Sequence, residues 1–78
     1  MPDPKDMLEQ QFLEMRWRSL SLAADLDRIE RLAGGAELLA SDPRLRQLRE
    51  AIQVLVSNGP NRAEKIQTIF SDETPGPI

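Results

Sequence analysis

The chain has 78 residues, of which 29% are charged, a net charge of −3, and neither cysteine nor histidine. A chain of this length forms one small domain at most, and it lacks the disulfides and histidine ligands that often stabilise small domains. The mixed signs and slight acidic excess argue against nucleic acid or an anionic membrane surface as the main partner.

The hydropathy of the sequence argues against a membrane-spanning protein. No run of 18 uncharged apolar residues occurs, and the beginning "MPDPKDMLEQ" has no apolar signal region. We therefore expect no membrane span, and together with the absence of cysteine this predicts a cytoplasmic protein.

The first predicted helix covers about residues 4–33. Asp3 is a good N-cap, Pro4 suits the first helical position, and Gly34-Gly35 supplies a stop. At 1.5 Å per residue this helix is about 45 Å long. It is long for so small a protein.

Apolar residues occupy two sides of this helix. The first set, which we call the seam, alternates spacings of four and three as in a helical bundle. It consists of Leu8, Phe12, Met15, Ser19, Leu22, Leu26, Ile29 and Ala33. The second set, which we call the Trp17 stripe, lies well round the helix and consists of Leu13, Trp17, Leu20 and Ala24.

Two shorter helices are predicted after the glycines. The connector "AELLA" is long enough for one helical turn, and Asp42 (or Ser41) with Pro43 then starts a helix at about 43–57 that ends near Asn58-Gly59. A third helix is predicted at about 60–70. Residues 71–78 form an acidic tail containing proline and glycine, which we expect to be disordered.

These elements predict an all-α fold with a single helical domain at residues 1–70. Helices 43–57 and 60–70 together run about 40 Å, nearly the length of the first helix. We expect them to fold back along the seam in a three-helix arrangement that dimerises into a helical bundle.

This arrangement leaves the Trp17 stripe uncovered. An exposed apolar patch usually marks an interface, and tryptophan is often its energetic centre. The predicted interface is Leu13, Arg16, Trp17, Leu20 and Ala24, with Arg16 at the rim. Arg18 is also expected at the rim. The partner is either a second copy in a homodimer or another protein, in which case the chain is a subunit or adaptor of a hetero-complex.

A helix-turn-helix is the main alternative function. The segment "LVSNGPNRAEKIQT" has its outline: two helices joined by a tight turn that contains glycine. The candidate nucleic-acid contacts are Arg44, Arg46, Arg49, Asn61, Arg62 and Lys65. The net negative charge argues against this function.

Candidate chemical sites have simpler explanations. Asp25, Asp27 and Glu30 lie within one turn of arginines, which favours a solvated, ion-paired face over a metal site. Ser19 has no histidine to activate it, and its hydroxyl is expected to bond to a carbonyl one turn earlier. We therefore predict a protein that is not an enzyme and uses no cofactor or metal.

Overall fold

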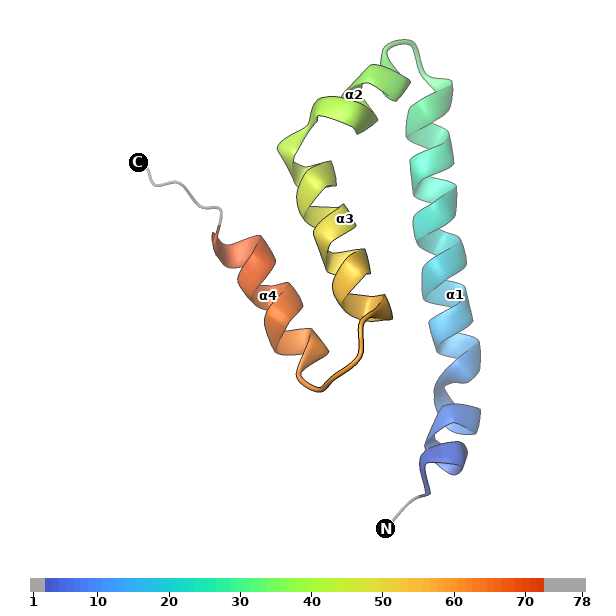
Figure 1. The fold of residues 1–78 in the computed structure, drawn as a ribbon. Helices are drawn as coiled ribbons and strands as arrows, with labels where there is room; N and C mark the ends of the chain where they lie inside the picture. Colours follow the sequence, from blue (N-terminus) through green and yellow to red (C-terminus); the bar gives the residue numbers. More distant parts are fainter. Residues whose placement is uncertain (1–2, 73–78) are drawn as a thin grey trace. The chain divides into compact units, whose positions relative to one another are not determined.

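The computed structural model describes residues 3–72, and every regular element in that range is a helix. The elements are α1 (Pro4–Arg31), α2 (Gly35–Ser41), α3 (Pro43–Val56) and α4 (Arg62–Asp72), shown in Figure 1. The all-α prediction is confirmed, but the described residues form four helices instead of three. Most of the predicted tail, from residue 73 on, lies outside the described residues.

The chain divides into two units, Met1–Ala36 and Glu37–Ile78. The first unit contains α1 and the first two residues of α2. The second contains the rest of α2 together with α3 and α4. The packing of the later helices along the seam, and with it the single domain, stays a prediction.

The start of α1 follows the predicted capping pattern. Asp3 is the N-cap in extended conformation, its carboxylate accepts a hydrogen bond from the Lys5 backbone N–H at 3.4 Å, and Pro4 occupies the first turn. A proline is favoured there because its missing N–H would have no helical partner. Local sequence therefore decides where this helix begins.

The turn after α1 depends on two different glycines. The helix ends at Arg31, and the Leu32 N–H bonds to the Ile29 carbonyl. Gly34 has a positive φ of 79°, which glycine adopts readily. Gly35 is needed for space, because a Cβ atom there would overlap the carbonyl oxygen of Ile29.

The additional helix arises from the Asp42-Pro43 pair. The segment read as a connector forms α2, and the Asp42 N–H closes its last turn on the Leu38 carbonyl at 2.9 Å. Proline disfavours helical conformation in the residue before it, and Asp42 is accordingly extended with ψ 129°. Asp42 therefore ends α2 and caps α3.

The α3 and α4 helices form an antiparallel hairpin within the second unit (Figure 1). Near the start of α3, the Gln47 amide donates to the carbonyl of Ile69, near the end of α4, at 3.4 Å. At the other end, the Arg62 guanidinium donates to the Ser57 carbonyl at 2.6 Å. Ala51, midway along α3, is 4% exposed, and a small residue there lets two helices approach closely.

The loop between these helices differs from the predicted one. Ser57 caps α3 in extended conformation, Gly59 has a φ of 109°, and α4 begins at Arg62 instead of Pro60. Asn61 has a φ of 68°, in the left-handed region that asparagine tolerates better than most residues. A residue in that conformation cannot continue a right-handed helix, so α4 starts after it.

None of the helices within residues 3–72 combines the length and apolar character that crossing a bilayer requires.

Candidate interaction surface

The four residues of the Trp17 stripe lie along the middle of α1, and all are exposed. Leu13 and Trp17 are 69% and 68% exposed, and Leu20 is 52% exposed. Their spacings of four, three and four residues bring them onto one side of the helix. The sequence-predicted interface therefore forms one continuous apolar strip on a single element.

Trp17 stands between two shallow depressions on the surface of α1. Four of the five predicted interface residues line one of them: Arg16, Trp17, Leu20 and Ala24, together with Ser21 and Arg28. The other is lined by Glu14, Trp17, Arg18, Ser21, Leu22 and Asp25. The indole thus forms a ridge with hollows on both sides, a relief into which the side chains of a facing helix can fit.

Charged residues border the stripe. Arg18 pairs with Glu14 and Arg28 pairs with Asp25, each at 3.3 Å. The Arg16 guanidinium makes no hydrogen bond or ion pair within residues 3–72, although the Arg16 carbonyl accepts the Ser19 hydroxyl at 2.9 Å. Arg16 is therefore the rim cation available to a partner.

The seam on the other side of α1 is unevenly covered. Its first three members, Leu8, Phe12 and Met15, are exposed, whereas Leu22, Leu26 and Ile29 are half-buried. The predicted hydrogen bond of Ser19 to a carbonyl of the preceding turn is confirmed. Apolar side chains on two sides of α1 are thus accessible over its amino-terminal half.

Of the acidic residues in the second half of α1, Asp25 forms an ion pair. Asp25 is held by Arg28, while the i,i+4 pair of Asp27 and Arg31 that the sequence allows is not formed. Among residues 3–72, no group of three or more acidic side chains is placed to share a metal ion.

The alternative nucleic-acid residues do not gather into one patch. Arg44, Arg46 and Arg49 lie in the first half of α3, whereas Asn61, Arg62 and Lys65 lie at the start of α4. Because the hairpin is antiparallel, the start of α4 adjoins the end of α3 (Figure 1). A helix-turn-helix pair crosses at about 90–120° and presents one recognition helix. The observed arrangement is an αα-hairpin.

Three of these arginines are already engaged within the chain. Arg44 forms an ion pair with Asp42 at 2.8 Å. Arg49 donates to the Leu39 carbonyl at 3.2 Å, and Arg62 donates to the Ser57 carbonyl. These carbonyls lie at or just beyond helix ends, where backbone acceptors lack helical partners. The arginines thus serve local structure.

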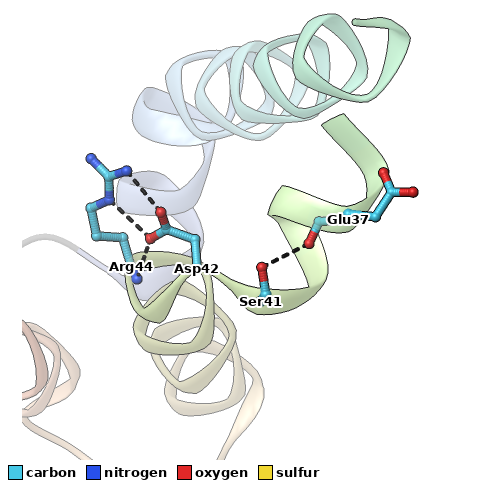
Figure 2. Close-up of polar contacts among 4 residues, drawn as sticks. All are labelled: Glu37, Ser41, Asp42 and Arg44. Carbon is cyan, nitrogen blue, oxygen red and sulfur yellow. Dashed lines mark hydrogen bonds and ion pairs between the residues drawn. The ribbon is translucent and has the colours of Figure 1, made fainter. Parts of the chain in front are cut away.

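The Asp42–Arg44 interaction is the shortest ion pair within residues 3–72 (Figure 2). Asp42 Oδ1 accepts from Arg44 Nε at 2.9 Å and from the Arg44 backbone N–H at 2.8 Å, and Oδ2 accepts from Nη2. The guanidinium, followed by the backbone N–H, lowers the pKa of Asp42 to about 2 from an ordinary value of 3.8. The carboxylate in turn raises the pKa of Arg44.

Sequence reasoning found the Asp42 cap but missed its ion pair. The signal in the sequence is "DPR", with an arginine two residues after an N-cap aspartate. The arginine backbone N–H bonds to the aspartate carboxylate, and the guanidinium of the same arginine can fold back onto that carboxylate. The related segment "DPK" at Asp3 forms the cap, with no ion pair between Lys5 and Asp3. The planar guanidinium permits the bidentate geometry that an ammonium group cannot adopt.

Comparison of the chain with protein families, with curated proteins and with solved structures found no match.

Proposed function

We propose that this protein is a non-enzymatic protein–protein interaction module that forms a homodimer through the Trp17 stripe and serves as a helical scaffold or regulator. The observation that carries the proposal is the exposure of the apolar residues on α1. This 28-residue helix is the only long helix among the described residues of its unit, and its large apolar residues from Met7 to Leu20 are exposed. Isolated helices are marginally stable in water, so α1 needs a partner surface.

The small amount of burial supports the same proposal. Ala51 is the only buried hydrophobic side chain among residues 3–72, while twelve large hydrophobic side chains are exposed. Burying a Leu or Phe contributes about 1.5–3 kcal/mol, and the methyl group of alanine contributes less. Contacts beyond each separate unit are therefore required to stabilise the fold.

The two apolar sides of α1 suggest a division of roles. In the proposed assembly, the seam is covered by the later helices of the same chain folded back along it, and the stripe is covered by the second copy. The result is a dimeric helical bundle. A different protein on the stripe is the other possible occupant, which would make the chain a subunit or adaptor. The proposal keeps the cytoplasmic location expected from composition.

The test is the molar mass in solution, measured by light scattering behind a sizing column over a hundredfold range of concentration. We expect a dimer, and we expect Trp17→Ala to weaken it by about 2 kcal/mol, or about thirtyfold in Kd. Helical content at a concentration where the variant is still dimeric should be unchanged by circular dichroism.

A matched control comes from two leucines of equal exposure. Leu13, in the stripe, and Leu32, just after α1, are both 69% exposed. Leu13→Ala should weaken the dimer, whereas Leu32→Ala should leave its Kd within about twofold. A wild-type monomer at high micromolar concentration would contradict the homodimer, as would equal effects of the two substitutions.

A further inference from the structure

Charged residues of opposite sign, Asp6 and Arg31, lie beyond the two ends of the Trp17 stripe. Asp6 and Glu9 border its amino-terminal end, and Asp27, Arg28 and Arg31 border its carboxyl-terminal end. Asp6 precedes Leu13 by seven residues and Arg31 follows Ala24 by seven, so both lie nearly in line with the stripe, two turns beyond it.

Asp6 and Arg31 are free to bind a partner. Both are exposed, and neither makes a side-chain hydrogen bond or ion pair within residues 3–72. Their neighbour Arg28 is already held by Asp25. Each charge also lies in the terminal turn of α1 that the helix dipole favours, the acid first and the base last.

The charge pattern distinguishes the two ways in which copies of α1 could pair. In a parallel pair equivalent residues meet, so Asp6 faces Asp6 and Arg31 faces Arg31. In an antiparallel pair whose two-fold axis is level with the bond between Arg18 and Ser19, Asp6 of each copy faces Arg31 of the other. Opposite charges and opposed helix dipoles both favour the antiparallel pair.

The same two-fold axis also places the apolar residues of the stripe opposite one another. It brings Leu13 opposite Ala24 and Trp17 opposite Leu20, so each side chain faces one of different size. All four residues and both terminal charges are thus paired by one two-fold axis, as an isologous interface requires.

We propose that the stripe binds a second copy of this chain in antiparallel orientation, with Asp6 of each copy opposite Arg31 of the other. The inference rests on the proposed function, because it specifies the occupant and orientation of the same surface. The Arg16 guanidinium, which has no partner within residues 3–72, then lies at the border of the dimer contact.

Spin-label distances in the full-length dimer test the orientation, since the chain has no native cysteine. A label on Lys5→Cys should be separated from its copy by about 40 Å along the helix axes in the antiparallel dimer, against about 10 Å in a parallel one. A label on Arg18→Cys, level with the axis but on the outer side of α1, should give a distance of about 20–30 Å across the two helices in either case.

The two labels distinguish failure of the proposed homodimer from failure of the antiparallel orientation alone. No coupling at Arg18→Cys, with a monomeric mass, would refute self-association and with it the proposed function in its homodimeric form. A dimer with a short distance at Lys5→Cys would overturn the antiparallel inference alone.

Charge reversal gives an independent test. Asp6→Arg and Arg31→Asp should each raise the dimer Kd about tenfold, because each makes two opposed pairs repulsive, and the double variant should recover most of the affinity. The double variant carries both unfavourable helix-end charges, so recovery reports pairing between copies. Glu30→Arg, off the stripe, should change Kd less than twofold. Single variants that bind like wild type, or a double variant without recovery, would overturn the inference.

Discussion

At the scale of single residues, Asp42 has the most structural roles. Its N–H closes the last turn of α2, its carboxylate caps α3, and the same carboxylate binds the Arg44 guanidinium. Its side chain is 12% exposed, whereas that of Arg44 is 82% exposed. Arg44 therefore covers the carboxylate while remaining in solvent, and the junction of two helices depends on one charged group.

This junction predicts a pH dependence of stability. The pKa of Asp42 is about 2 in the folded chain and 3.8 ordinarily. The folded value is the lower one, so the stabilising contribution is present above about pH 4 and is lost as the pH falls from there through about 2. A carbon-13 NMR titration of the Asp42 carboxyl should show a midpoint near 2.

Asp42→Asn tests the same contribution through the free energy of unfolding. Asparagine keeps a capping oxygen but not the charge. The variant should be less stable than wild type at pH 5, and the difference should shrink towards pH 2. Asp3→Asn is the control, because Asp3 caps α1 before a proline without an ion pair, and it should alter the pH profile less. An unchanged profile for Asp42→Asn would contradict the assigned role.

The adjacent glycines of the first turn make a second prediction at this scale. Gly34→Ala introduces a Cβ atom into open space but at a φ of 79°, which costs about 1–2 kcal/mol for a non-glycine residue. Gly35→Ala should destabilise more, because the new Cβ meets the Ile29 carbonyl and the backbone must move. Urea unfolding of both variants at equal concentration checks the order. The reverse order would show that the close approach at Gly35 is not required.

At the scale of elements, the α3–α4 hairpin shows how pairing depends on a small residue. The large aliphatic residues of α3 are spaced three, four and three residues apart, as on one side of a helix, yet the buried position is Ala51. They are Leu45, Leu48, Ile52 and Leu55. Gln47, Ala51 and Val54 share a different side of α3, and this side bears the hydrogen bond to α4. On the large aliphatic side of α3, Leu45, Leu48 and Ile52 are half-buried and Leu55 is exposed.

Enlarging Ala51 tests the hairpin. Ala51→Leu should destabilise the second unit by about 1–3 kcal/mol, because the added volume has no space at a 4% exposed position. Ala63→Leu is the matched control: Ala63 is exposed on α4, and the two residue types have similar helix propensity. The check is the difference in unfolding free energy between the variants. Equal stabilities would show that α3 and α4 do not pack closely at Ala51.

At the scale of the whole molecule, assembly and folding are expected to be linked. A chain with one buried hydrophobic side chain among residues 3–72 depends on surfaces that further contacts cover. If the dimer binds through α1, dilution below its Kd removes the stabilisation of α1.

This linkage predicts concentration-dependent stability. The Tm should rise with protein concentration, and amide hydrogen exchange of α1 should slow more than that of α3 as the dimer forms. Exchange measured by mass spectrometry at concentrations on both sides of the Kd is the check. A Tm and an exchange pattern independent of concentration would contradict a folding-linked dimer.

The sequence by itself determined the features that depend on neighbouring residues. Proline after aspartate started α1 and α3 at the expected positions, Ser19 bonded to the preceding turn, and helical spacing placed the stripe on one side of α1. These features are local because capping and helical periodicity involve residues within about one turn of each other.

Only the tertiary structure decided which apolar side of α3 meets α4 and which cations are free. Arg49 and Arg62 could have bound phosphate, but they reach carbonyls ten and five residues away in the sequence. Ala51 could have been exposed, but the antiparallel return of α4 covers its side of α3. Such outcomes depend on where the chain turns, as at Asn61, and single-helix periodicity does not encode the direction of a turn.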